Sequence, residues 1–189
     1  MRKLTISIAI ALLLVLPMLS GCIGGGDDDI EPWEGDIEDL LLTVDDLGEG
    51  YEVESESYDD PEEFADDVTD LEAHGFQEGT MADFGFFDWE NMVMGAQMVL
   101  RFDADKMDGL LDDFKDSIDL GADEIDEISL GNYGDETIAF KILSSDLEGF
   151  GAYAIGFTKN DVMVFIMVVS NDDEGDLVKS LADTVLDKF

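Results

Sequence analysis

The side chains that most often carry out catalysis are scarce in this sequence. His74 is the only histidine, and it stands beside Gly75 at the end of a predicted helix, where it is expected to cap that helix. The chain contains no GxSxG, GxGxxG or HExxH motif, the local signatures of many hydrolases, dinucleotide-binding proteins and metalloproteases. We therefore predict no catalytic residue and no cofactor, in a protein that is not an enzyme.

Carboxylates, in contrast, are abundant, with 48 Asp and Glu against 9 Lys and Arg. Paired carboxylates can cleave glycosides, but close pairs arise by chance in so acidic a chain, and a hydrolase is the least favoured alternative. The fragment Asp103-x-Asp105-x-x-Asp108-Gly109 has some spacing of a calcium loop. Met107 takes a ligand position there and the glycine comes one residue late, so we predict no metal site.

The formal net charge of −39 bears on partners and habitat. Such a surface repels nucleic-acid phosphates and anionic lipid headgroups, so we predict no nucleic-acid partner. Its self-repulsion weakens the folded state at low salt and fades at high salt, where the Debye length falls to about 3 Å at 1 M. The composition therefore predicts a halophilic or marine source, an archaeon being the favoured case.

Residues 1–21 have the features of a signal peptide, namely a basic start, an apolar run and small residues at its end. The final tetrapeptide, Leu19-Ser20-Gly21-Cys22, resembles the lipobox of bacterial and archaeal prolipoproteins. The resemblance implies that Leu19, Ser20 and Gly21 are recognised by the signal peptidase. It also implies that Cys22 receives a lipid and becomes the first residue of the mature chain. The alternatives are a plain signal peptide with a chance cysteine, or an uncleaved anchor.

These features predict three segments. A signal peptide covers 1–21, the lipidated cysteine and a flexible acidic tether cover 22–35, and one globular domain covers 36–189. Cys22 is the only cysteine, so no intrachain disulfide can form. We predict a cell-membrane protein, anchored on the extracytoplasmic face through the lipid on Cys22. Trp33, near the end of the tether, either packs onto the domain or stays a free surface aromatic.

Hydrophobic periodicity predicts the elements of the domain. The expected helices cover about 36–42, 61–75, 104–120 and 173–188, and the expected strands cover about 51–56, 80–87, 91–102, 124–130, 137–143, 150–158 and 161–170. The last of these strands is apolar on both faces, so both faces must be covered. We predict an α+β fold: a mostly antiparallel sheet of about six to seven strands covered by about four helices, as an α/β sandwich.

One short segment extends this expectation. Asp46-Leu47-x-x-Gly50-Tyr51, after a predicted helix, resembles the opening of small secreted sensor-like domains of bacterial lipoproteins and of extracellular receptor-kinase domains. The order of elements is also similar to that of PsbP-like domains. The resemblance implies a fold neighbourhood and no particular activity.

The aromatic run that ends the 80–87 strand provides the candidate binding residues. Alternation places Phe84 and Phe86 on one face, and Phe87 and Trp89 on the other. If the first pair is core, Phe87 and Trp89 are exposed near a hairpin tip and are our candidate ligand-binding residues. The alternative is that helices cover both faces. The methionines of the 91–102 strand line either the core or an adaptable apolar pocket.

We therefore predict a non-catalytic binding or interaction module that holds an apolar small molecule or an envelope protein. The main alternative is an anchored subunit of an envelope protein complex.

Overall fold

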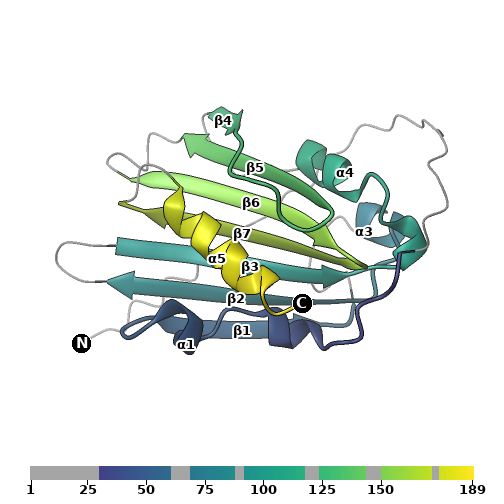
Figure 1. The fold of residues 1–189 in the computed structure, drawn as a ribbon, viewed down its shortest axis with the longest axis horizontal. Helices are drawn as coiled ribbons and strands as arrows, with labels where there is room; N and C mark the ends of the chain where they lie inside the picture. Colours follow the sequence, from purple (N-terminus) through teal and green to yellow (C-terminus); the bar gives the residue numbers. More distant parts are fainter. Residues whose placement is uncertain (1–29, 61–68, 88–91, 118–123, 144–149, 172–174) are drawn as a thin grey trace.

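The computed structural model describes residues 30–60, 69–87, 92–117, 124–143, 150–171 and 175–189. Seven strands form one antiparallel sheet in the order β1-β2-β3-β7-β6-β5-β4 (Figure 1). The strands are β1 (Glu52–Tyr58), β2 (Glu78–Phe87), β3 (Met92–Arg101), β4 (Glu124–Glu127), β5 (Glu136–Leu143), β6 (Gly151–Lys159) and β7 (Val162–Ser170). The helices are η1 (Ile37–Leu40) and η2 (Ala104–Lys106), both 3-10, and α1 (Val44–Leu47), α3 (Thr69–Ala73), α4 (Leu110–Ser117) and α5 (Asp176–Leu186). The predicted class is correct in outline, although the sheet dominates and the helices are short.

Two meanders meet at the centre of the sheet. Strands β1 to β3 follow one another in space, as do β4 to β7, and β7 closes the sheet by pairing with β3. This central place explains why β7 is apolar on both faces, because side chains of alternate residues enter two different cores. Val164 belongs to one core and Phe165 to the other. The predicted cover on both faces of this strand is confirmed.

One face of the sheet, which we call the α5 face, is covered by α5 and by the N-terminal segment 33–42 (Figure 1). Helix α5 buries Val178, Leu181 and Val185 against residues of β3, β6 and β7. The opposite face, the α4 face, is covered by α3 and α4, whose buried residues include Leu71, Leu110 and Phe114. A large apolar area is thus removed from water on both sides of the sheet, which is the main stabilising contribution to such a fold.

The N-terminal segment 33–42 enters the fold beside Arg101 and Asp161. The backbone N–H of Trp33 donates to Oδ1 of Asp161 over 2.8 Å, and Nη2 of Arg101 donates to the carbonyl of Gly35 over 2.6 Å. The Arg101 guanidinium also lies 5.7 Å from the centre of the Trp33 ring, which in turn packs against Phe189. Of the two alternatives for Trp33, the structure therefore shows the packed one.

Two predicted helices are broken. The expected helix at 36–42 is instead η1 followed by α1, because Thr43 caps a new helix through a reciprocal capping box with Asp46. The expected helix at 104–120 is η2 followed by α4. Gly109 has a φ of 76°, a left-handed conformation that ends one helical segment before the next begins. Residue 118 and the two that follow lie outside the described residues.

Two boundaries also differ from the prediction. Helix α5 begins at Asp176 after Gly175, which adopts a left-handed conformation as N-cap, and not at about residue 173. The β6–β7 turn consists of Asn160 and Asp161, one residue later than expected, since Lys159 pairs with Val162. Asn160 has a positive φ of 56°, a conformation that asparagine tolerates in a two-residue hairpin turn.

In the parts of the chain that the structure describes, we find no helix with the length and apolar character needed to cross a membrane.

Candidate functional site

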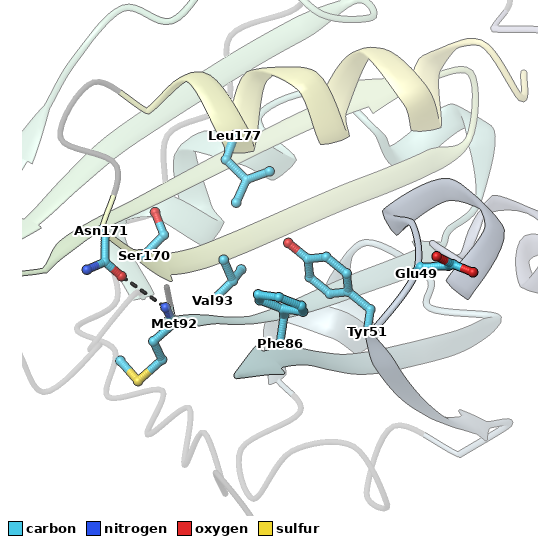
Figure 2. Close-up of a pocket in the computed structure, with 8 residues that line it drawn as sticks. All are labelled: Glu49, Tyr51, Phe86, Met92, Val93, Ser170, Asn171 and Leu177. Carbon is cyan, nitrogen blue, oxygen red and sulfur yellow. Dashed lines mark hydrogen bonds between the residues drawn. The ribbon is translucent and has the colours of Figure 1, made fainter. Parts of the chain in front are cut away.

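An open pocket of about 370 Å³ lies on the α5 face at one end of the sheet. Its lining residues come from the loop before β1, from three strands and from α5 (Figure 2). They are Glu49, Tyr51, Phe86, Met92, Val93, Ser170, Asn171 and Leu177. A pocket of this size is at the lower end of the range, roughly 300 to 1,000 Å³, in which small molecules bind. We call this end of the sheet the pocket end.

The strand register creates the floor of this pocket. Phe86 of β2 pairs with Val93 of β3, and Val93 pairs with Ser170 of β7, so these three side chains form one row on the α5 face. Tyr51 extends the row, with its ring centre 5.4 Å from that of Phe86. Leu177, from the first turn of α5, lies across the opening from these rings (Figure 2). An apolar ligand therefore has one wall from the sheet and one from the helix.

Several polar atoms converge on this apolar floor. Oδ1 of Asn171 accepts a hydrogen bond from the backbone N–H of Met92 over 3.0 Å, which fixes the amide at the mouth of the pocket. Burial raises the pKa of Tyr51 above 10.0, so its hydroxyl is partly withdrawn from water. Within the described part of the chain, neither this hydroxyl nor the Glu49 carboxylate has a hydrogen-bond partner. The Tyr51 hydroxyl is therefore available to a ligand, whereas the Glu49 side chain lies beyond Tyr51, away from Phe86 and Leu177 (Figure 2).

The predicted binding residues are only partly placed by the structure. Phe87 has 64% of its surface exposed and lies on the α4 face, away from the pocket, and Trp89 lies outside the described residues. Sequence alternation placed Phe84 and Phe86 on one face; Phe84 is buried in the core, whereas Phe86 is only half-buried. Alternation alone does not show that Phe86 lies near the end of β2, where α5 no longer covers the sheet fully and a side chain can line a pocket. Cys22, Leu19, Ser20 and Gly21 also lie outside the described residues.

The single histidine, His74, joins neighbouring helices and has no catalytic partner among its hydrogen bonds in the described residues. Nδ1 of His74 lies 2.6 Å from the carbonyl oxygen of Lys106, and Nε2 lies 3.0 Å from Oδ2 of Asp113. The ring therefore links the end of α3 to η2 and α4. This differs from the predicted cap of its own helix, because the chain after Gly75 brings η2 closer to the ring. No serine is among its hydrogen-bond partners.

The acids are not gathered into a catalytic pair at this pocket. Partial burial, then the charges of Glu54 and Glu56, raises the pKa of Asp83, while burial and three nearby aspartates raise the pKa of Glu136. Asp83 is on β2 and Glu136 on β5, four strands away, or about 19 Å at 4.8 Å per strand. The two carboxylates of a glycosidase are about 5 to 9.5 Å apart. In the described residues no three His, Cys, Asp or Glu side chains are placed to hold a metal ion.

The methionine row of β3 lies on the α4 face, as the alternation predicts. Met98 is buried in the core beneath α3 and α4, whereas Met92 and Met94 are only half-buried. The core interpretation thus holds at the Met98 end of the strand, whereas the other end presents a half-buried apolar surface on the α4 face.

Comparison with known proteins identifies no family. No family model matches the chain, and no curated protein matches its sequence. The structure is similar to that of the extracellular domain of PknH from Mycobacterium tuberculosis, with a TM-score of 0.56 and 14% identity over 80% of this chain and 93% of that domain. An uncharacterized protein from Mycobacterium smegmatis is more distant, with a TM-score of 0.45 and 11% identity over 81% of this chain and 96% of the other. The chain thus shares its fold with a domain known from outside the cell, and the likeness extends to the fold alone.

Proposed function

We propose that this protein is a lipid-anchored module on the extracytoplasmic face of the membrane, and that it binds a small apolar molecule without chemical conversion. The observation that carries the binding role is the pocket between Leu177 of α5 and the row formed by Tyr51, Phe86 and Val93. The anchoring role rests on the lipobox-like tetrapeptide that ends at Cys22. Surfaces that combine an apolar floor with a few convergent polar groups are typical of small-molecule sites.

The position of the tether supports this proposal. The chain enters the fold beside Arg101, whereas the pocket includes Val93, at the other end of the same strand. Eight residues of extended chain separate them, or about 27 Å at 3.4 Å per residue. A domain attached at the Arg101 end presents the pocket on the side away from the membrane. A ligand can then reach the pocket from the surrounding medium.

Native mass spectrometry of the full chain, purified from its own membrane at high salt, tests both the lipid anchor and the bound small molecule. We expect a mass that begins at Cys22 and carries a lipid, with a further bound small molecule. The matched variant Leu177→Asp places a charge in the apolar wall and should lose the small molecule while keeping the lipid. A mass that still contains residues 1–21 overturns the anchor. Equal retention of the small molecule by Leu177→Asp overturns the pocket.

A second candidate, an anchored subunit of an envelope complex, is favoured by a different surface. Phe87 is the most exposed of the large apolar side chains in the described residues, and it pairs with the half-buried Met92 on the α4 face. Aromatic and methionine side chains are enriched in protein interfaces. The same mass measurement distinguishes the candidates, because a subunit retains a second polypeptide. A Phe87→Ser variant should release that polypeptide and leave a small molecule in place.

A further inference from the structure

The α4 face of the sheet has an accessible apolar surface at the pocket end. Phe87 has 64% of its surface exposed, and the side chains around it are half-buried, namely Met92, Met94, Met167 and Val169. Phe87 pairs with Met92 across β2 and β3, and Met94 pairs with Val169 across β3 and β7, so the register brings them together. Within the described part of the chain, α3 and α4 lie toward the other end of this face, where β3 finishes (Figure 1). We call these five residues the methionine surface.

Three acids border the methionine surface on the same face. Glu52 pairs with Gly85, which in turn pairs with Met94, and Glu54 pairs directly with Asp83. Among the described residues, no lysine, arginine or histidine forms an ion pair with any of these three acids. The pKa of Asp83 is raised, first by partial burial and then by the neighbouring acids of β1. We call Glu52, Glu54 and Asp83 the acid border.

The methionine surface has the dimensions of a site for a helix. It spans β2, β3 and β7, which is two strand spacings or about 10 Å, and an α-helix with its side chains is about 10 Å wide. The protein covers other parts of its sheet in the same way, with α5 on one face and α4 on the other. Methionine side chains adapt to the shape of whatever packs on them. A further helix therefore fits this part of the sheet.

The acid border determines the charge of that helix. A second copy of this chain would bring another formal net charge of −39, and anionic lipid headgroups would meet the same repulsion. A helix with lysine or arginine beside its apolar face would instead give the bordering acids the cations that they lack. Charge complementarity of this kind selects one partner against others.

We propose that the methionine surface docks a basic amphipathic helix of a partner protein. Its apolar side chains pack on Phe87, Met92 and Met94, and its basic side chains lie beside Glu54 and Asp83. This docking site is on the opposite face of the sheet from the small-molecule pocket. It rests on the second candidate function, whose partner it defines by chemistry.

The methionines themselves report the binding of a helix. The full chain, with ¹³C-labelled methionine methyl groups, is held in phosphatidylcholine nanodiscs and followed by NMR. The probe is a synthetic amphipathic helix of about five turns with leucine on one face and lysine beside it. Its signals of binding are shifts of Met92, Met94 and Met167, while the buried Met107 and Met163 should not shift. Protein-free nanodiscs measure the partitioning of the probe into lipid.

A twin probe with glutamate in place of lysine tests the charge. In 1 M KCl the Debye length is about 3 Å, so only charges in contact contribute. We expect the lysine helix to bind about tenfold more tightly than its twin. The double variant Glu54→Gln/Asp83→Asn should weaken the lysine helix about threefold. The matched control is Asp183→Asn/Asp187→Asn, which removes two exposed charges on and beside α5, on the other face, and should bind as the natural chain does.

A second pair of variants tests the apolar contact. Phe87→Ser should weaken both probes about threefold or more, because the ring is buried by the docked helix. Val44→Ser, at an exposed apolar residue of α1, should change neither.

Equal binding of the two probes overturns the basic partner, as does an equal loss in the two double variants, because the effect then belongs to net charge. Absence of shifts at the three reporting methionines with either probe overturns the docking site. The pocket is tested apart from it, because Leu177→Asp should bind the lysine helix normally and lose only the small molecule.

Discussion

The side chain of Gln97 joins the centre of the sheet to Leu42 of the N-terminal segment, since its Oε1 atom accepts a hydrogen bond from the Leu42 N–H over 2.6 Å. Its Nε2 group donates to the carbonyl of Leu40 over 2.9 Å. Gln97 and Leu40 have 0% of their surface exposed, and Leu42 has 1%. One buried amide thus satisfies two backbone groups of a segment that has no strand neighbour of its own.

Replacement of Gln97 by methionine should therefore be costly. Methionine has a similar volume but leaves the Leu42 N–H and the Leu40 carbonyl buried without partners, at about 1 to 3 kcal/mol of unfolding free energy. Urea unfolding of the variant and the natural chain measures the difference. Gln77→Met is the matched control, because the Gln77 side chain donates an exposed hydrogen bond to Asp103. Similar losses in the two variants would contradict the assigned role of Gln97.

Arg101→Lys should loosen the N-terminal segment. Arg101 donates to Glu78 over 2.5 Å and to the Gly35 carbonyl, while it lies over Trp33. A lysine cannot make this forked set of contacts. We expect a loss of about 1 to 3 kcal/mol and faster proteolysis within residues 33–42, read by mass spectrometry of the cleavage products. Lys106→Met, which removes an exposed ion pair with Asp103, should leave the stability nearly unchanged, because water screens exposed charges.

Asp46 should contribute stability that disappears in acid. Although burial acts in the opposite direction, hydrogen bonds from Lys188 and Thr43 lower the pKa of Asp46 below 3.8 in the folded chain. A lowered pKa means that the contribution is complete above 3.8 and is lost as the pH falls through the folded-state pKa. Asp46→Asn should therefore cost about 0.5 to 2 kcal/mol at pH 7, the usual range for a helix cap.

The check for Asp46 is urea unfolding of this variant from pH 7 down to pH 3. The difference in unfolding free energy between Asp46→Asn and the natural chain should become smaller as the pH approaches 3. Asp45→Asn, in the same helix, serves as the control. A gap that stays constant over the whole range would exclude the ionised carboxylate as its cause.

The ionised Asp83 side chain, in contrast to that of Asp46, should lower the stability of the folded chain. It faces Glu54 directly across β1 and β2, and its pKa is raised by partial burial and by Glu54 and Glu56. Its ionised form is therefore penalised in the fold, and the penalty disappears as the pH falls through the raised pKa. Asp83→Asn should stabilise the chain by about 0.2 to 1 kcal/mol in 0.05 M KCl at pH 7. In 2 M KCl the gain should shrink, whereas a gain that persists would point to a cause other than charge repulsion.

The chain as a whole should need salt. With a net charge of −39, self-repulsion opposes folding until it is screened. We expect the unfolding temperature in 2 M KCl to exceed that in 0.05 M KCl, as measured by circular dichroism. Sucrose at equal osmolality is the control for effects other than screening. Equal unfolding temperatures at both salt concentrations would remove the basis for a halophilic or marine source.

The sequence alone determined the features that depend on local pattern. The alternation of apolar residues predicted the strands, the antiparallel sheet and the two-sided burial of β7, because side chains alternate between the faces of a strand regardless of distant contacts. The Asn160 turn and the scarcity of catalytic side chains are likewise legible in the chain. The lipobox-like segment at Cys22 remains a prediction from sequence.

Only the tertiary structure decided where the candidate site lies. Glu49, Phe86 and Leu177 are far apart in sequence, and no local pattern says that the ends of β2 and β7 and the start of β3 lie beside the first turn of α5. The same holds for Gln97 and Arg101, which look like ordinary polar positions of a strand but hold the N-terminal segment. Strand order and helix placement depend on long-range packing, and packing distinguishes Phe86, which lines a pocket, from Phe84 two residues earlier, which is core.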